Sequence, residues 1–289
     1  MNIEKWIFKN SENLFGKTVV ISGATGGIGR YLCYYLCYLG AKVILLCRNE
    51  KKYTDLKNEI TEKISDADLS YIIADLEDFE SVKEVCEKLK DIEIDYLIHN
   101  AGVYNIPRKL CKTGYNNIFQ TNFISPYYMT KELGDNVKKV IAVSSIAHNY
   151  SKIDIKDIDF SKRRASSKVY GNSKRFLMFS MLELLKKGEI SDLAVAHPGI
   201  TVTNMTSHYP KLIYAIIKYP MKIIFMKPQI ACLSILKAMF EKCDSNFWIG
   251  PSLFDIWGMP RKKKIRTAKK DEREKISEIS EKIYLELKD

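Results

Sequence analysis

Short apolar runs rich in β-branched residues alternate along the chain with longer amphipathic stretches. The first run, at 18–21, predicts a buried strand, and the apolar positions at 30–39 predict a helix. The alternation continues, with strands expected at 41–47, 69–74, 94–98, 137–143, 193–196 and 247–249, and helices at 51–64, 78–90, 114–133 and 168–186. This alternation predicts an α/β fold with a doubly wound parallel sheet of about seven strands and helices on both faces.

Glycines separate the first expected strand from the first expected helix, at Gly23, Gly27 and Gly29. Gly23 permits a tight turn, Gly27 lets a pyrophosphate approach the backbone, and Gly29 lets the helix pack closely against the strand. The helix N-terminus offers free N–H groups and a positive dipole end to an anion. Glycines also serve ordinary turns, but their place between strand and helix favours a Rossmann-type dinucleotide site.

The second expected strand ends at Cys47, Arg48 and Asn49, where an NAD-binding protein usually carries an acid for the ribose hydroxyls. Cys47 is not an acid, and Arg48 is a cation. This pair favours the 2′-phosphate of NADP(H). The alternative interpretation is that Arg48 is an exposed surface arginine without a ligand.

The carboxyl ends of parallel strands are where such folds bind their ligands. Short segments that the fold would place at the binding edge follow several of the later expected strands. They are Asp75 and Leu76, then Asn100, Ala101 and Gly102, then Ser144 and Ser145, and finally Pro198. Asn122 falls inside the helix at 114–133, which we expect to be perturbed around Pro126. Tyr170 and Lys174 lie one turn apart on the helix at 168–186.

The 289 residues contain no Pro/Gly/Ser-rich linker and no internal repeat, so we expect a single NAD(P)-binding domain over 1–289. A net charge of +11 is compatible with nucleic acid, an acidic membrane surface or a phosphorylated ligand. Part of that charge lies at 261–270, which we interpret as a basic, solvated helical tail starting at about 261. No aromatic residues interleave with these cations, so we expect no nucleic-acid partner.

The chain has seven cysteines, an odd number, and no CxxC pair, which fits a reducing compartment better than a secreted disulfide scaffold. The first 15 residues lack the uninterrupted apolar core of a signal peptide. We therefore expect a cytoplasmic location. The four histidines have no metal-ligand spacing, so no metal is expected.

Taken together, these motifs resemble those of the short-chain dehydrogenase/reductase superfamily over about 17–260. SGATGGIG stands where that family shows TGxxxGIG, and in the family's order follow HNAG, Asn122, a Ser–Ser pair, YGNSK for YxxxK, and HPGITVT. The segments CRN, VSSIAH and GPSLFDIWGMP are similar to those of the retinol-dehydrogenase-like branch. Substrate identity does not transfer, because related enzymes reduce many carbonyls.

The resemblance implies that Asn122, Ser145, Tyr170 and Lys174 are catalytic. Tyr170 would donate a proton to a carbonyl oxygen, and Ser145 would hydrogen-bond that oxygen. Because Lys174 lies at i+4 from Tyr170, we expect its charge to lower the phenol pKa from about 10. By resemblance, Lys174 also holds the nicotinamide ribose, and Asn122 anchors a water that relays protons to Lys174. The alternative for Tyr170 and Lys174 is an ordinary surface pair on a helix.

Cofactor contacts are likewise implied for residues at each motif. Those expected at the phosphates are Gly23, Thr25, Gly27 and Ile28, with Arg48 and Asn49 at the 2′-phosphate. Those expected at the adenosine are Asp75, Leu76, Asn100, Ala101 and Gly102, and those near the nicotinamide are Tyr170, Lys174, Pro198, Ile200 and Thr203.

The span 209–227 is rich in large apolar residues but is interrupted by Lys218, Pro220 and Lys222, and is too broken for a transmembrane helix of about 20 residues. The resemblance places the substrate lid here. A lid over a lipophilic pocket is our preferred interpretation, a membrane-contact segment is the second, and a packing helix is the third.

The expected function is therefore an NADP(H)-dependent oxidoreductase that interconverts a carbonyl and an alcohol on an apolar small molecule. Two alternatives are a catalytically idle dinucleotide-sensing protein and a peripheral membrane-associated protein. The intact catalytic set argues against the first. A homo-oligomer is a further open alternative.

Overall fold

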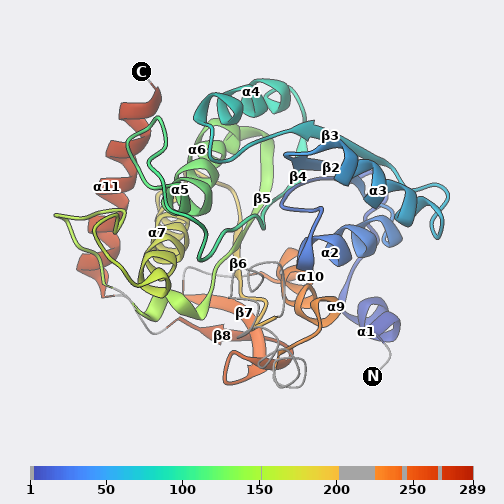
Figure 1. The fold of residues 1–289 in the computed structure, drawn as a ribbon. Coiled ribbons are helices and arrows are strands. Elements are labelled where there is room, and N and C mark those ends of the chain that lie inside the picture. Colours follow the sequence, from blue (N-terminus) through green and yellow to red (C-terminus); the bar gives the residue numbers. More distant parts are fainter. Residues whose placement is uncertain (1–2, 151, 202–224, 243–245, 266–268, 289) are drawn as a thin grey trace, which may run out of the picture.

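The computed structural model describes residues 3–150, 152–201, 225–242, 246–265 and 269–288, and Figure 1 shows their fold. A central sheet has the strand order β3-β2-β1-β4-β5-β6-β7-β8. Its strands are β1 (Thr18–Ser22), β2 (Lys42–Cys47), β3 (Leu69–Ile73), β4 (Ile94–His99), β5 (Val137–Val143), β6 (Leu193–Ala196), β7 (Phe247–Leu253) and β8 (Trp257–Lys264).

Helices connect these strands and cover the sheet. The α-helices are α1 (Ile3–Asn10), α2 (Gly27–Tyr38), α3 (Glu50–Thr61), α4 (Phe79–Leu89), α5 (Asn117–Phe119), α6 (Ser125–Leu133), α7 (Ser166–Lys187), α9 (Pro228–Ala231), α10 (Leu233–Phe240) and α11 (Lys270–Lys288). Shorter elements are a π-helix, η1 (Gln120–Ile124), and two 3-10 helices, η2 (Gly134–Asn136) and η3 (Ile146–Tyr150).

The pairing of the strands confirms the predicted α/β fold. The pairs from β3 through to β7 are parallel, and each parallel connection between neighbours passes through at least one helix. The order reverses at β1, where the chain leaves toward β3 on one side and returns to β4 on the other. Such a reversal opens a crevice at the carboxyl ends of the strands, which is where ligands bind in sheets of this kind.

Two apolar clusters cover the two faces of the sheet. Successive residues of β1 alternate between them, because side chains of a strand point to opposite faces. Val20 packs in the cluster with α4, α6, α7 and α11, whereas Val19 and Ile21 pack in the cluster with α2, α3 and α10. The near-continuous apolar runs at 18–21 and 42–47 therefore reflect strands that are covered on both sides.

The edge strand β8 corrects one expectation. We predicted that the basic residues from about 261 begin a helical tail, but 257–264 pair with β7 in the antiparallel direction, with Arg261 opposite Gly250. Lysine and arginine side chains are compatible with an edge strand because one side of such a strand is solvated. The helix begins only at Lys270.

The long helix expected at 114–133 starts at Asn117 and is interrupted in its middle. The turn at Gln120–Ile124 is a π-helix, and regular α-helix resumes at Ser125 with Pro126 in its first turn. Proline lacks the N–H of a helical bond, and a first-turn position does not require one. The predicted perturbation is confirmed, but it lies in the turn before Pro126.

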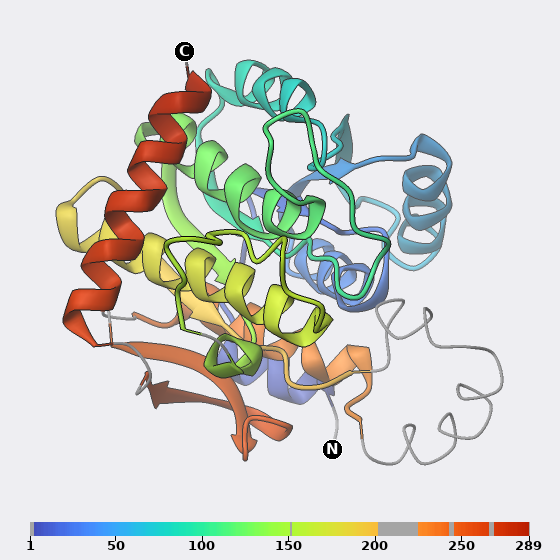
Figure 2. The ribbon, with the colours of Figure 1, turned by 60° about the vertical axis from the view of Figure 1, so that its left-hand side comes forward.

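The C-terminal helix α11 is docked on the body of the protein, which differs from the solvated tail we expected. Figure 2 shows α11 crossing α7 and α6 on one face of the molecule. Ile276 and Ile283 are buried in that contact, and the Lys131 ammonium lies 3.0 Å from a Glu281 carboxylate oxygen. We did not recognise the buried apolar stripe of α11 in the sequence, because most residues of this helix are charged.

Candidate active site

The turn between β1 and α2 is shaped by close backbone contacts at two glycines. Gly23 has φ +68°, and a Cβ atom at this position would lie 2.7 Å from the Cα of Ala101. A Cβ on Gly29 would lie 2.2 Å from the carbonyl oxygen of Gly23. Gly27, with φ +50°, is the first residue of α2. The turn and the close approach of helix and strand are those expected from the sequence.

Hydrogen bonds tie this turn to the end of β4. The Asn100 side-chain amide donates to the carbonyl oxygens of Ser22 at 3.0 Å and Gly23 at 3.1 Å. The Ala101 N–H donates to the Ser22 hydroxyl at 3.1 Å. We expected Asn100 at the adenosine; its amide instead holds the end of β4 to the end of β1 and so shapes the turn.

A pocket of about 600 Å³ opens along these strand ends. It gathers most of the expected cofactor contacts, and its lining residues include Gly23, Thr25, Gly27, Ile28, Arg48, Asn49, Asp75, Leu76, Asn100, Ala101 and Gly102. Residues from the ends of β1, β2 and β4 and from the loop after β3 thus surround one space, as the doubly wound topology requires.

Cations lie at the β2 end of this pocket. Arg48 and Asn49 line it as expected, and Lys52 in the first turn of α3 lines it as well. The Asn49 side-chain oxygen accepts from the Lys52 backbone N–H at 3.0 Å and caps α3. The sequence analysis missed Lys52, although its position four residues after Arg48 at a helix start was a usable signal. Two exposed cations and the positive end of α3 favour an anion here.

Thr121 was also missed as a lining residue of the pocket. It is 6% exposed, and its hydroxyl has no hydrogen-bond partner within the described part of the chain. A buried hydroxyl without a partner costs free energy, of the order of 1–3 kcal/mol, unless a ligand or water satisfies it. The same stretch of backbone, in η1, carries Asn122.

Asn122 is fully buried and is held by the Val103 backbone and the Ser173 side chain. Its side-chain oxygen accepts from the Val103 N–H at 2.8 Å, and its amide nitrogen donates to the Val103 carbonyl at 3.0 Å and to the Ser173 hydroxyl at 3.0 Å. The π-turn at this position turns the residue toward the loop after β4 and toward α7. Departures from α-helix of this kind are frequent at functional sites.

Ser145 and Tyr170 come from different elements and meet at their hydroxyl groups. Ser145 follows β5, and Tyr170 lies in the second turn of α7. Burial raises the pKa of Tyr170 to about 12, and a hydrogen bond with the Ser145 hydroxyl opposes that rise. The ring of Tyr104 stands edge-on to the Tyr170 ring, with the centroids 5.2 Å apart.

Lys174 lies one turn further along α7 and is 2% exposed. Its ammonium nitrogen donates to the Val143 carbonyl oxygen at 2.8 Å and lies 6.0 Å from the centre of the Tyr170 ring. Burial lowers the pKa of Lys174 to about 7. A Cβ atom on Gly102 would lie 3.3 Å from the Lys174 nitrogen, so this amine borders the far end of the pocket.

The electrostatics of this pair differ from our expectation. We predicted that the Lys174 charge lowers the Tyr170 pKa, whereas burial raises the Tyr170 pKa to about 12 and a hydrogen bond with Ser145 is what opposes that rise. The lysine nitrogen donates to the Val143 carbonyl oxygen and lies 6.0 Å from the centre of the phenol ring. Because burial lowers the Lys174 pKa to about 7, the amine is uncharged at the pH where the phenol titrates. Spacing on a helix brings two residues to the same face but does not fix where a long side chain points.

The segment after β6 borders the same edge of the sheet. The His197 N–H donates to the Ile249 carbonyl at 2.7 Å, Pro198 is buried, and the Ile200 carbonyl accepts from the Met226 N–H at 2.9 Å. These contacts place Pro198 and Ile200 beyond β5 and β6, outside the lining of the pocket described above. Thr203 and most of the expected lid at 209–227 lie outside the described residues.

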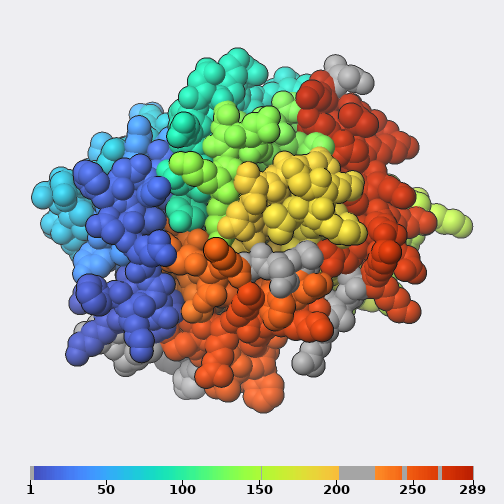
Figure 3. Space-filling view, turned by 180° about the vertical axis from the view of Figure 1, so that it is seen from behind, coloured from blue at the N-terminus to red at the C-terminus, as the bar shows by residue number. Residues whose placement is uncertain are grey.

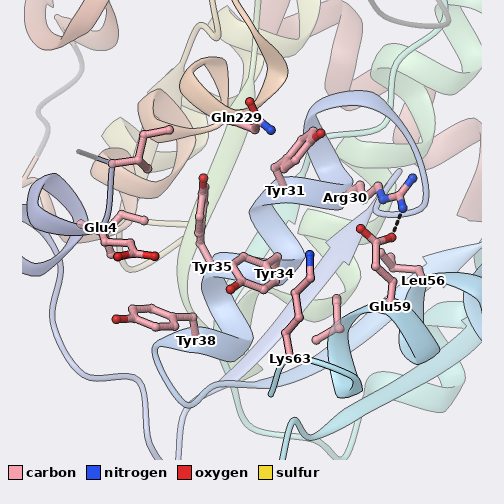
Figure 4. A pocket seen from close by; sticks show the side chains of 13 residues that line it. Glu4, Arg30, Tyr31, Tyr34, Tyr35, Tyr38, Leu56, Glu59, Lys63 and Gln229 are labelled. Atoms are coloured by element: carbon pink, nitrogen blue, oxygen red, sulfur yellow. Dashed lines mark hydrogen bonds and ion pairs between the residues drawn. The ribbon is translucent and has the colours of Figure 1, made fainter. Parts of the chain in front are cut away.

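A second pocket of about 510 Å³ lies on the outer side of α2, away from the catalytic set. Figure 4 shows its wall of tyrosines on α2, facing α1 and α3, with Arg30 paired to Glu59 at its rim. Tyr31, Tyr34, Tyr35 and Tyr38 recur at helical spacing, so they form a continuous stripe. Sequence analysis gave this stripe no role.

Among the described residues, no helix is both long and apolar enough to cross a membrane. In the same residues, no group of three or more His, Cys, Asp and Glu side chains could hold a metal ion.

Comparison with known proteins gives a consistent result. The profile of a family described as short chain dehydrogenase matches residues 17–211. An uncharacterized oxidoreductase of Schizosaccharomyces pombe is 30% identical over 229 residues, which cover 73% of this chain and 68% of that protein. Retinol dehydrogenase 12 of Mus musculus is 30% identical over 200 residues, which cover 66% of this chain and 63% of that protein.

Solved structures share the fold. A structure of an uncharacterized protein of Mycobacterium paratuberculosis superposes with a TM-score of 0.71 at 22% identity, covering 96% of each chain. A metagenomic short-chain oxidoreductase in complex with NADP superposes with a TM-score of 0.57 at 18% identity, covering 81% of this chain and 96% of that chain.

Proposed function

Because the chain belongs to the short-chain dehydrogenase/reductase family of oxidoreductases, we propose that it interconverts a carbonyl and an alcohol with NADP(H), on an apolar substrate. The observation that carries the reaction is the grouping of Tyr170, the neighbouring Ser145 that lowers its pKa, and the buried Lys174 amine 6.0 Å from its ring. The pocket for the nicotinamide dinucleotide ends at Gly102, close to the Lys174 amine of the same constellation.

The lining of the pocket fits a dinucleotide by its chemistry. The backbone at Gly23 and Gly27 is free of side chains, and the N-terminus of α2 faces the same space. Arg48 and Lys52 offer positive charge at one end, and the Thr121 hydroxyl offers a donor between the ends. A bound nicotinamide would supply or accept the hydride.

Tyr170 is the proton donor in the proposed reduction. Its pKa of about 12 keeps the proton on the hydroxyl until a carbonyl oxygen gains negative charge. Ser145 donates a hydrogen bond to that oxygen and stabilises the charge. The phenolate left on Tyr170 is stabilised, once the Lys174 amine is protonated, by a positive charge on the next turn of α7.

Proton return to Tyr170 involves Lys174 and Asn122. With a pKa of about 7, the Lys174 amine can give up or accept a proton near neutral pH. The Asn122 side chain fixes the Val103 backbone beside Gly102, which in turn borders the amine. In the proposed relay, protons reach Lys174 along this side of the site.

The preference for NADP(H) is supported by the cations at the end of β2. A 2′-phosphate carries a charge near −2 that must be paired, and Arg48 and Lys52 both line that end of the pocket. The neighbouring Cys47 is buried, and burial raises the pKa of its thiol, so it brings no negative charge that would repel a phosphate.

An apolar substrate is supported by the aromatic edge beside the proton donor. Tyr104 contacts the Tyr170 ring, so the approach to the hydroxyl has an aromatic wall. Relatives named retinol dehydrogenases share about 30% of their aligned residues with this chain, and their name supports the same class of substrate.

The experiment that tests this function is a screen of NADPH oxidation with a panel of aldehydes and ketones of increasing alkyl length. We expect turnover with the longer members and a Tyr170→Phe variant that retains cofactor binding but not turnover. If the wild-type protein binds NADPH but turns over none of the panel, the result contradicts the proposed function and favours the dinucleotide-sensing alternative.

For the cellular setting we propose the cytoplasm, with peripheral membrane contact through 209–227 and a homo-oligomer as two open alternatives. The cysteines at 33, 37, 47, 86, 111 and 232 are free thiols, which supports a reducing compartment. Fractionation of cells expressing the tagged chain tests the location, and light scattering of the purified protein tests for a homo-oligomer.

A further inference from the structure

The C-terminal helix α11 is linked to the loop that carries Ser145. The link is the side chain of Arg175, which follows Lys174 on α7 and is 2% exposed. Its guanidinium donates to both carboxylate oxygens of Glu272, from Nε at 2.8 Å and from Nη2 at 2.6 Å. A third donor, Nη1, reaches the backbone carbonyl oxygen of His148 at 2.9 Å.

His148 in turn holds Ser145. The His148 backbone N–H donates to the Ser145 carbonyl oxygen at 3.1 Å, and its ring nitrogen Nδ1 lies 2.6 Å from the same oxygen. A carbonyl oxygen only accepts, so Nδ1 carries the proton. Burial lowers the pKa of His148 to about 4, and the charge of Arg175 acts in the same direction, so the ring is neutral at pH 7.

Other contacts hold the near end of this loop against α7. A Cβ atom on Gly171 would lie 2.3 Å from the Ala147 carbonyl oxygen, so α7 and η3 touch at that residue. The Ser144 hydroxyl also donates to the Lys174 carbonyl at 3.2 Å. Arg175 adds the contact at His148, on the C-terminal side of Ser145, and that contact depends on a residue of α11.

We propose that Glu272 and Arg175 are positioning residues that set the Ser145 hydroxyl against Tyr170, so that the docked C-terminal helix is part of the active-site scaffold. The proposal rests on the proposed function, because it concerns the same catalytic serine. The new element is that catalysis would require α11, a helix that lies against α7 and contributes no residue to the pocket.

The chemistry of the Glu272–Arg175 pair supports a fixed geometry. A guanidinium bound through two parallel N–H donors to a carboxylate has a defined orientation, which leaves its remaining nitrogen aimed in one direction. The Ile153 N–H also donates to Glu272 at 3.3 Å, and Phe179 lies under the guanidinium at 5.0 Å. Without the carboxylate charge, the buried guanidinium loses the two contacts that fix its orientation.

The same helix contact provides a matched control. Arg273, the next residue of α11, lies 3.0 Å from a carboxylate oxygen of Glu183 on α7 and also faces Phe179, at 5.9 Å. This ion pair joins the same two helices and is similarly buried. Figure 3 shows the red C-terminal segment against the yellow segment that contains the end of α7.

The test compares Glu272→Gln with Arg273→Gln by steady-state kinetics as a function of pH. We expect both variants to melt a few degrees below wild type, because each loses one ion pair of the same interface. Glu272→Gln alone should lose about 10-fold in kcat, with the KM for NADPH within about 2-fold of wild type. A merely structural role for Glu272 predicts equal kinetics in the two variants.

The pH profile of alcohol oxidation reports the Tyr170 pKa, and through it the contact between Ser145 and Tyr170. The Ser145 hydrogen bond lowers the Tyr170 pKa, so weakening it raises that pKa. We expect the rising limb of kcat to move upward by about 0.5–1 pH unit in Glu272→Gln and to stay in place in Arg273→Gln. An unmoved limb in Glu272→Gln would overturn the proposal.

A readout that does not need turnover separates this proposal from the proposed function. Hydrogen exchange at the His148 amide, which donates to Ser145, should quicken about 10-fold in Glu272→Gln and stay unchanged in Arg273→Gln. If wild type turns over no carbonyl, the proposed function fails and the exchange data still decide whether Glu272 holds this loop. Equal exchange in all three proteins would refute the positioning role.

Discussion

The Lys174 amine donates to the Val143 carbonyl oxygen at 2.8 Å, inside the protein and 6.0 Å from the centre of the Tyr170 ring. The amine is therefore buried against the end of β5, and burial lowers its pKa to about 7. A free lysine has a pKa of about 10.4, so folding discourages the charged form. This arrangement has consequences for stability that differ in direction from those for activity.

Lys174→Met should abolish turnover and weaken cofactor binding, yet leave the protein as stable as wild type or more so near neutral pH. The methionine fills a similar volume without a charge to bury. The folded pKa of Lys174 lies below the unfolded one, so its destabilising effect is complete below about pH 7 and absent above about pH 10.4. The melting-temperature advantage of the variant should therefore shrink as the pH rises from 6 to 10. An advantage that grows with pH would contradict the assignment.

Tyr170→Phe should lower kcat by about 10²–10⁴-fold, since the hydroxyl alone is the proton donor. The edge-on contact with Tyr104 involves the ring and survives the change. The dissociation constant for NADPH, measured by fluorescence titration, should stay within about 2-fold of wild type. Tyr104→Phe is the control, because it alters a neighbouring phenol without touching the proposed proton donor. Turnover of Tyr170→Phe within a few-fold of wild type would remove this residue from the mechanism.

NADPH should bind more tightly than NADH, and both Arg48 and Lys52 should contribute. A charge-assisted contact is worth about 1.5–3 kcal/mol, or roughly 10- to 150-fold in affinity. Arg48→Ala and Lys52→Ala should each weaken NADPH binding and leave NADH binding nearly unchanged. Lys51→Ala is the matched control, because that exposed lysine is the immediate neighbour of Lys52 and is not among the residues that line the pocket. Equal affinities of wild type for the two cofactors would refute the preference.

Gly29→Ala should destabilise the fold and abolish dinucleotide binding, since the new methyl group would lie 2.2 Å from the Gly23 carbonyl oxygen. The helix would have to move away from the strand that forms the cradle. Gly250→Ala is a suitable comparison, because its Cβ would come no closer than 3.4 Å to any neighbour. Thermal melting with and without NADPH measures both effects. A Gly29→Ala protein that still gains stability from NADPH would show that the close approach is dispensable.

The sequence predicted the parts of this site that depend on local pattern. Gly23 and Gly29 occupy positions where a Cβ atom would collide with the backbone. Tyr170 and Lys174 lie on one helix, so their spacing alone brings them to the same face. Lys52 was missed because its role depends on where α3 starts, and that start is set by the cap at Asn49. The rest could not be predicted because it depends on distant partners.

The partners of two C-terminal elements illustrate this limit. The basic residues of β8 show no apolar alternation, because an edge strand with a solvated side does not require it. They form a strand because they pair with β7. Arg175 and Glu272 are 97 positions apart in the sequence, and neither stands in a motif. The Lys174 side chain is likewise bonded to a backbone oxygen of β5, and its burial there removes the expected effect of its charge on the Tyr170 pKa.

The π-turn at Gln120–Ile124 has a consequence for how this chain tolerates insertions and deletions. A π-turn is a helix with one surplus residue, and each residue of a regular helix rotates the chain by about 100°. Deleting Phe123 would rewind the turn into ordinary helix and swing Asn122 by about that angle relative to α6. The surplus residue therefore changes the rotation of the helix between its two halves. As a result α6 keeps its apolar stripe on the sheet while Asn122 faces the strand ends.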